Sequence, residues 1–140
     1  MRQLCRVLLM VVLAFGFAPA SASEAPLRIA GAATVNADGV IDLVQTHADL
    51  AIIDNRTVAD YDAGHIEGAL HLLDTDMADA EVLGRMVKSK NAPLLFYCNG
   101  VKCGRAANAS AKAVSWGYTQ VYYYALGLAE WKERGLPLVH

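Results

Sequence analysis

The chain has 140 residues, which is enough for one domain with a hydrophobic core and too few for two domains of ordinary size. Its formal net charge is −2, and its basic residues are scattered along the sequence without forming a run. This charge balance argues against nucleic acid as a partner.

The N-terminal segment has the layout of a secretory signal peptide. Arg2 and Arg6 precede an apolar run over residues 7–17, and Ala20-Ser21-Ala22 supplies the small residues of a cleavage site. Because the apolar run is too short for a comfortable membrane span, we expect cleavage after Ala22, with Ala20 as the other possible position. An uncleaved N-terminal anchor is the alternative.

Removal of residues 1–22 leaves a short lead-in over 23–28 and a domain over 29–140. The expected destination is across the inner membrane, in the bacterial periplasm, with no membrane contact after cleavage. The mature chain keeps ten basic and fourteen acidic residues, a net charge of −4, and only Cys98 and Cys103 of the three cysteines.

Segments with strand and helix patterns alternate along the mature chain. Apolar runs bounded by polar or turn residues predict strands over 29–35, 50–53, 69–73, 94–97 and 120–124. Helical spacing predicts helices over 39–48, 58–62, 76–86, 105–116 and 128–134. Asp38 is placed to cap the first helix, and the inner face of the third is expected to carry Met77, Val82, Leu83 and Met86. The alternation predicts a single α/β domain whose central sheet is mainly parallel and flanked by helices.

Two polar or reactive residues directly follow predicted strands. Asp54 comes after the strand over 50–53, and Cys98 comes after the strand over 94–97. Because the carboxyl ends of parallel strands meet at one edge of a sheet, we expect both residues on the same rim.

The segment that follows Cys98 predicts a nucleophilic cysteine on an anion-binding loop. A thiol between a strand end and a helix N-terminus is stabilised as the thiolate, which is the reactive form. We therefore expect the Cys98 sulfur to be solvent-accessible and surrounded by main-chain amides. Gly100 and Gly104 would permit the backbone angles that such a loop requires. The expected binding residues for a small anion are Asn99, Gly100, Val101, Lys102, Cys103, Gly104 and Arg105.

Charged residues and a second thiol in this loop have more than one interpretation. Lys102 and Arg105 add positive charge, which would lower the Cys98 pKa and attract an anionic substrate. Lys102 is equally a solvated surface charge, and Arg105 is alternatively the partner of a carboxylate. A bridge from Cys98 to Cys103 would close very little chain, so the pair indicates chemistry more than structure.

Three groups of residues together resemble the single-domain rhodaneses, a family of sulfurtransferases. The first group is a strand end with an Asp-x-Arg pattern and a Gly-His-Ile-x-Gly-Ala turn, the second an active-site Cys loop, and the third a C-terminal Trp-Gly-Tyr and Gly-x-Pro signature. In this chain they are Ile52 to Arg56 with Tyr61 and Gly64 to Ala69; Phe96 to Cys98 with Arg105; and Trp116 to Tyr118, Val121-Tyr122, Gly127, Trp131-Lys132 and Gly135 to Pro137. The resemblance covers roughly residues 29 to 138, nearly the whole mature chain.

The active-site loop departs from the pattern of that family. The family loop usually returns an Arg at the fifth position after the Cys, whereas this chain has Cys103 there and Arg105 two positions later. The usual Gly pair before the final helix is Leu126-Gly127 here, a change that we interpret as cosmetic.

The resemblance implies a double displacement through a persulfide on Cys98. A small anionic donor such as thiosulfate would leave its outer sulfur there, and a thiol, a protein acceptor or cyanide would then remove it. This is covalent catalysis that needs no metal and no organic cofactor, and the scattered histidines suggest no metal site. Asp54, Arg56 and His65 are expected to support the rim loops. Cys103 is either a resolving thiol, which captures the persulfide or closes a disulfide with Cys98, or a small packing residue.

Three other functions compete with sulfur transfer. Relatives of this fold with longer loops act as cysteine phosphatases or arsenate reductases, although their Arg follows the Cys by six positions and here it follows by seven. Thiol–disulfide exchange through Cys98 and Cys103 suits an oxidising compartment. A non-catalytic binding module is the fourth possibility, and the presence of Cys98 disfavours it.

Overall fold

The computed structural model describes residues 24–140. The predicted signal peptide over residues 1–22 lies outside the described residues. None of the helices in the described part of the chain has the length and apolar content that a bilayer crossing requires.

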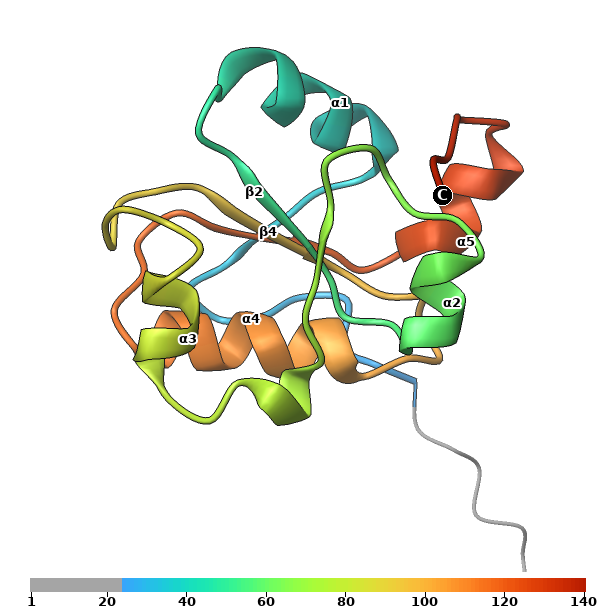
Figure 1. The fold of residues 1–140 in the computed structure, drawn as a ribbon. Helices are drawn as coiled ribbons and strands as arrows, with labels where there is room; N and C mark the ends of the chain where they lie inside the picture. The colour runs from blue at the N-terminus through green and yellow to red at the C-terminus, as the bar shows by residue number, and fades with distance from the viewer. Residues whose placement is uncertain (1–23) are drawn as a thin grey trace, which may run out of the picture.

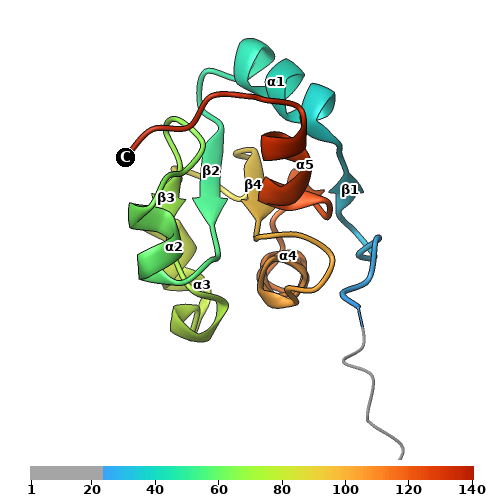
Figure 2. The same cartoon turned by 90° about the vertical axis from the view of Figure 1, so that its right-hand side faces the viewer.

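Five parallel strands form one sheet in the order β1-β5-β4-β2-β3 (Figures 1 and 2). The strands are β1 (Ala33–Thr34), β2 (Ala51–Asp54), β3 (Leu70–His71), β4 (Leu94–Tyr97) and β5 (Val121–Tyr124). The helices are α1 (Ala37–Thr46), α2 (Val58–Asp62), α3 (Ala80–Gly84), α4 (Arg105–Ser115) and α5 (Gly127–Glu133), with a 3₁₀ turn, η1, over Asp74–Asp76. The predicted α/β class with a parallel central sheet flanked by helices is confirmed.

The sheet separates two hydrophobic layers because successive side chains of a strand point to opposite faces. Ile53 and Phe96 pack with residues of α4 and α3, while Ile52 and Leu95 pack with residues of α1 and α5. Figure 2 shows these two pairs of helices on opposite sides of the sheet. All four side chains are at most 5% exposed. Both faces of β2 and β4 are therefore buried, which explains their uninterrupted apolar sequences.

Helix α4 packs closely on the sheet because its inner face consists of small residues. The buried positions of this helix are Ala106, Ala107, Ala109, Ser110 and Ala113. The close fit fixes the N-terminus of α4 near the carboxyl end of β4, to which it is joined by the loop over 98–104.

The predicted helix over 76–86 is wrong in its extent. The structure has η1, then a break at Met77, and then the short helix α3. The Nζ of Lys112 donates to the carbonyl oxygens of Asp74 (2.6 Å) and Met77 (3.0 Å), and this long-range contact holds the segment out of helix. Asp79 caps α3 by accepting from the Glu81 amide at 2.9 Å, so a new helix starts there.

The predicted cap of the first helix is also wrong. The side chain of Asn36 caps α1 and accepts from the Gly39 amide at 3.0 Å. Asp38 lies in the first turn and forms an ion pair with Arg134, 2.6 Å away.

The N-terminal lead-in before residue 29 contacts the domain at two points. The Ala25 amide donates to the Val101 carbonyl, and the Tyr123 hydroxyl donates to the Pro26 carbonyl.

Candidate functional site

The candidate site lies at the point where the strand order reverses. From this point β2 leads outward to β3 in one direction, and β4 leads to β5 in the other. Asp54 is paired with Tyr97 in the register of β2 and β4, so Asp54 and Cys98 follow neighbouring strand ends. The predicted shared rim is therefore confirmed, and it is the usual position of ligand sites in such sheets.

The loop after β4 folds back on itself. Gly100 has a φ of 155°, which a residue with a side chain rarely adopts, and the Cys103 amide donates to the Gly100 carbonyl at 2.9 Å. Gly104 has a φ of −80°, which any residue adopts. The expectation that Gly104 is needed for its backbone angles is therefore wrong, whereas Gly100 meets it.

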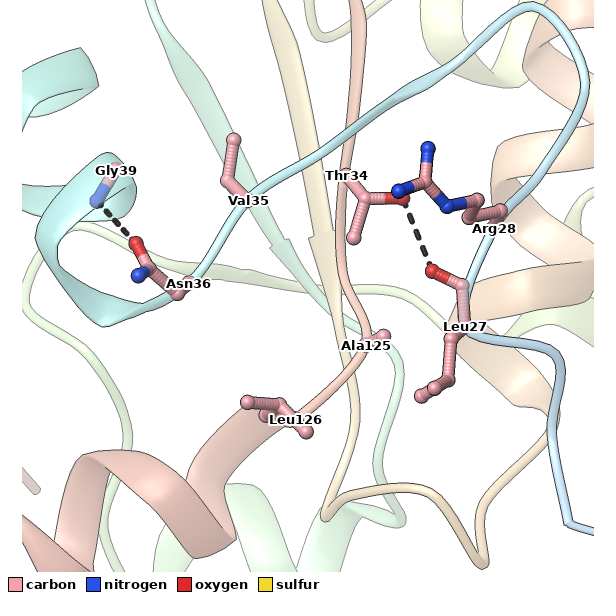
Figure 3. A pocket seen from close by; sticks show the side chains of 8 residues that line it. All are labelled: Leu27, Arg28, Thr34, Val35, Asn36, Gly39, Ala125 and Leu126. Atoms are coloured by element: carbon pink, nitrogen blue, oxygen red, sulfur yellow. Dashed lines mark hydrogen bonds between the residues drawn. The ribbon is translucent and has the colours of Figure 1, made fainter.

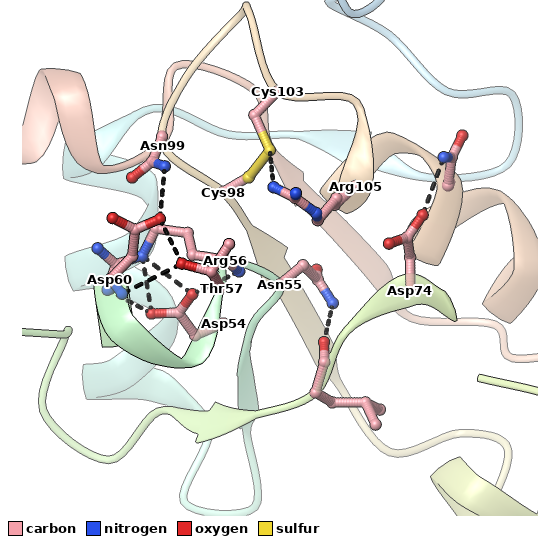
Figure 4. The surroundings of a disulfide bond; sticks show 12 residues. Asp54, Asn55, Arg56, Thr57, Asp60, Asp74, Cys98, Asn99, Cys103 and Arg105 are labelled. Atoms are coloured by element: carbon pink, nitrogen blue, oxygen red, sulfur yellow. Dashed lines mark hydrogen bonds and ion pairs between the residues drawn. A yellow bond between two sulfur atoms is a disulfide. The ribbon is translucent and has the colours of Figure 1, made fainter. Parts of the chain in front are cut away.

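A disulfide joins Cys98 and Cys103, whose Cα atoms lie 6.1 Å apart (Figure 4). Cys98 is only 2% exposed and packs with the apolar cluster on the α4 face, while Cys103 is partly exposed. The expectation of a solvent-accessible Cys98 is wrong for this oxidised form, because Cys98 is bonded to Cys103 and buried in that apolar cluster. Chain-entropy arguments give so short a ring only about 2 kcal/mol of stabilisation.

The predicted binding residues surround one hollow of ≈ 530 Å³. Asn99, Gly100, Val101, Lys102, Cys103 and Arg105 line it together with Ala129 of α5, and Gly104 is the one predicted loop residue that is not among them. The side chain of Lys102 is exposed. The hollow brings together residues that a small anion would contact.

Arg105 contacts the second cysteine. Its Nη1 donates to the Sγ of Cys103 at 3.7 Å. We expected this cation to act on Cys98, and the structure instead places its hydrogen bond on the sulfur that faces the hollow. The N-cap residue of α4 is Gly104, so the amides of the first turn have no side-chain cap.

A second hollow lies beside β1 and holds none of the predicted site residues (Figure 3). It measures ≈ 570 Å³ and is lined by Leu27, Arg28, Thr34, Val35, Asn36, Gly39, Ala125 and Leu126. This lining contains no cysteine, histidine or carboxylate, and the hydroxyl of Thr34 donates to the Leu27 carbonyl, so the hollow offers no activated nucleophile and no general base for covalent chemistry.

A buried ion pair fixes the end of β2. The Nη2 of Arg56 lies 2.7 Å from the Oδ2 of Asp54, and both side chains are at most 2% exposed. The same Nη2 donates to the Gly64 carbonyl at 2.8 Å, and the Tyr97 hydroxyl donates to Asp54 Oδ2 at 2.6 Å. These contacts join the ends of β2 and β4 to the turn at Gly64.

The pKa values of Arg56 and Tyr97 keep both groups protonated in this network. Burial lowers the pKa of Arg56, but the hydrogen bond and charge of Asp54 outweigh that effect, and the pKa is raised overall. Burial, followed by the negative charge of Asp54, raises the pKa of Tyr97. The guanidinium therefore stays charged and the phenol stays protonated, which is the donor arrangement that Asp54 requires.

His65 takes part in a local packing arrangement. Its ring stacks on Tyr61 with centroids 3.8 Å apart, its Nδ1 lies 3.0 Å from the Tyr61 carbonyl oxygen, and its backbone bridges to Val139. His71 Nε2 lies 2.8 Å from the Arg56 carbonyl oxygen. No group of His, Cys, Asp and Glu within residues 24–140 has the arrangement of a metal site. The supporting role of Asp54, Arg56 and His65 stays a prediction.

Asp60 is a site neighbour that the sequence analysis missed. Its Oδ2 accepts from Thr57 Oγ1 at 2.8 Å and from Asn99 Nδ2 at 3.3 Å (Figure 4). The hydrogen bond from Thr57, followed by that from Asn99, lowers the Asp60 pKa, so a carboxylate holds the loop. The Thr-x-x-Asp spacing at a helix start resembles a capping box and was the available signal.

Gly127 is a second missed position, because we interpreted the change before it as cosmetic. Its φ is 55°, and a Cβ atom there would overlap the Cys98 carbonyl oxygen and lie 3.1 Å from the Gly100 amide nitrogen. The next two amides of α5, those of Leu128 and Ala129, donate to the carbonyls of Cys98 and Asn99 at 2.9 Å each. The first turn of α5 therefore fixes the start of the loop at Cys98 and Asn99 through these two hydrogen bonds.

Comparison with known proteins identifies the class. Residues 36–134 match the rhodanese-like domain. The chain therefore belongs to the rhodanese-like domain family, which confirms the resemblance that the motifs indicated and which includes sulfurtransferases.

Individual relatives are more distant. The uncharacterised protein YibN of Escherichia coli K12 is 35% identical over 92 residues, which make up 65% of this chain and 62% of YibN. The solution structure of the polysulfide-sulfur transferase homodimer of Wolinella succinogenes is similar with a TM-score of 0.62 and 21% identity, over 79% of this chain and 80% of that one. A Rhodopseudomonas palustris protein described as a possible tyrosine phosphatase has a TM-score of 0.63 and 20% identity, over 79% of this chain and 86% of that one. At these identities the two solved structures establish the shared fold alone.

Proposed function

We propose that this protein is a sulfurtransferase that carries sulfane sulfur as a persulfide on Cys98. The observation that supports this best is the position of Cys98, which directly follows β4 and begins a folded-back loop that ends at the uncapped N-terminus of α4. Such a position stabilises a thiolate and the persulfide anion that replaces it. Membership of the rhodanese-like family supports the same chemistry.

The reaction consists of two displacements. The reduced Cys98 thiolate attacks the outer sulfur of thiosulfate, the S–S bond of thiosulfate breaks, and sulfite leaves with the electron pair. An acceptor thiolate or cyanide then attacks the outer sulfur of the persulfide, and the Cys98 thiolate is the leaving group. Lys102 and Arg105 at the hollow supply positive charge for the incoming anion.

The structure contains the disulfide form, in which Cys98 has no free thiol. Reduction of the Cys98–Cys103 bond must therefore precede sulfur uptake. Cys103 lines the hollow and Cys98 does not, so an external thiol meets Cys103 first.

The proposal is tested with reduced mature protein, thiosulfate and cyanide. We expect sulfite release accompanied by thiocyanate, and loss of both by more than about 1,000-fold in Cys98→Ser, because the nucleophile is removed. Cys103→Ser is the matched control, which keeps the persulfide-forming thiol and should retain sulfite release. Absence of Cys98-dependent sulfite release contradicts the proposal, and turnover of an aryl phosphate or arsenate instead would favour an oxyanion-handling phosphatase or reductase.

Thiol–disulfide exchange is the second candidate, and the Cys98–Cys103 bond is the observation that favours it. In that case the oxidised protein oxidises a dithiol to a disulfide and takes up no sulfane sulfur. Dithiol oxidation that requires both cysteines, in a protein that releases no sulfite, would select this function.

We also propose that the mature protein acts in the periplasm, on the strength of the signal-peptide layout of residues 1–22. Expression of the full chain in a Gram-negative host should give a periplasmic product that begins at residue 23 or near it. Intact mass and cell fractionation measure this. A full-length product in the membrane fraction would instead favour the uncleaved anchor.

A further inference from the structure

Cys103 is the group that lies between the Cys98 sulfur and the hollow. We propose that Cys103 is a resolving thiol, which attacks the Cys98 persulfide, releases its outer sulfur as hydrosulfide and leaves the Cys98–Cys103 disulfide. This inference rests on the proposed function, because it requires that the persulfide forms. With a resolving thiol, the sulfane sulfur is released as free hydrosulfide and is not transferred to an acceptor.

The loop brings the two sulfurs together while its ends remain fixed. The Cα atoms of Cys98 and Cys103 lie 6.1 Å apart, within the usual range for a disulfide. The turn closed by the Cys103 amide and the Gly100 carbonyl produces this approach. The Leu128 amide donates a hydrogen bond to the Cys98 carbonyl at 2.9 Å, so the backbone of Cys98 is held against α5.

A cation lies beside the sulfur of Cys103. The guanidinium of Arg105 donates to Cys103 Sγ at 3.7 Å in the disulfide form, and a cation beside a cysteine favours the ionised sulfur once the bond is reduced. A small residue that only packs the loop needs no such partner. The contact therefore supports a chemical role for the second thiol.

The resolving step balances as an exchange between sulfurs. The Cys103 thiolate attacks Cys98 Sγ, a bond forms between these two sulfurs, and the bond from Cys98 Sγ to the outer sulfur breaks. The outer sulfur leaves with the electron pair of the broken bond, takes one proton from water, and appears as hydrosulfide. The persulfide sulfur is reduced and the two cysteines are oxidised, so a dithiol reductant must supply two electrons and two protons before the next turnover.

The difference in exposure of the two cysteines gives the reductant a direction of attack. Cys103 lines the hollow, whereas Cys98 is 2% exposed. An external thiolate therefore attacks Cys103 Sγ and expels the Cys98 thiolate at the N-terminus of α4, where negative charge is stabilised. Reduction by this route regenerates the nucleophile directly.

The experiment measures sulfite and hydrosulfide from the same sample. Reduced wild-type protein, freed of reductant under anaerobic conditions, is mixed with excess thiosulfate and followed by sulfite assay, hydrosulfide assay and intact mass. We expect one sulfite and one hydrosulfide per chain, with a final mass that lacks two hydrogens and contains no added sulfur. Addition of a dithiol should then restart the release of both products.

Cys103→Ser and Cys98→Ser separate the two proposals. Cys103→Ser should release one sulfite, lose the hydrosulfide signal by roughly tenfold or more, and keep one added sulfur in its mass. Its sulfite burst also shows that the variant is folded. Cys98→Ser should release neither product.

Two results would overturn the resolving role while leaving sulfur transfer intact. One is wild-type protein that releases sulfite but retains the added sulfur, and the other is hydrosulfide release that persists in Cys103→Ser. Absence of sulfite from both wild-type and Cys103→Ser protein would instead refute persulfide formation itself.

Discussion

Replacing Arg56 with methionine is expected to lower the free energy of unfolding by about 3–5 kcal/mol. The substitution leaves the carboxylate of Asp54, which is 0% exposed, without its cationic partner. It also removes the donor to the Gly64 carbonyl. A buried charge that has lost its partner is far more costly than the pair was worth.

Arg134→Met is the matched control. Arg134 and Asp38 form an ion pair of similar length, 2.6 Å, but their side chains are 37% and 69% exposed. Solvent screens this pair, so its removal should lower the free energy of unfolding far less than the Arg56 substitution does. Urea unfolding with an unchanged m value measures both variants. If both variants lost the same free energy of unfolding, burial would not explain the contribution of the Arg56–Asp54 ion pair to stability.

The sequence predicted most of the strands and helices because their patterns are local. The strand over 94–97 and the helix over 58–62 have the predicted bounds. The apolar run Leu94 to Tyr97 ends at a cysteine in a Gly-bearing loop, and Val58 to Asp62 follows a threonine cap. The helix over 76–86 was mispredicted because Lys112, more than 30 residues away, binds the carbonyls of Asp74 and Met77.

In the candidate site too, the features set by local sequence were predicted and those set by tertiary contacts were not. A strand end followed by a glycine loop places Cys98 and the binding residues on the rim, and this placement needs no tertiary information. The burial of Cys98 depends on how the loop folds back at Gly100, and the hydrogen bond from Arg105 to Cys103 depends on that same fold. Neither feature has a signature in the residue pattern. The contact of Gly127 with Cys98 joins segments 29 positions apart and is equally invisible in the sequence.

That contact gives the second large effect that we expect. Gly127→Ala should destabilise the protein by about 2–4 kcal/mol, since it adds overpacking to left-handed backbone strain. Its Cβ would overlap the Cys98 carbonyl oxygen and crowd the Gly100 amide. Relief requires separation of α5 from the loop, which breaks the bonds from Leu128 and Ala129 to Cys98 and Asn99. We therefore expect sulfite release to fall by more than about tenfold, because a small misplacement of the nucleophile has a large kinetic cost.

Gly135→Ala isolates the contribution of the contact. Gly135 has a similar φ of 65°, but a Cβ atom there meets nothing within 4 Å. It should therefore show backbone strain alone, about 1–2 kcal/mol, with sulfite release close to that of the unmodified protein. Chemical unfolding and the thiosulfate assay on both variants decide the matter. If the two alanine variants lost stability and activity equally, the close approach of α5 would have no role in holding Cys98 in place.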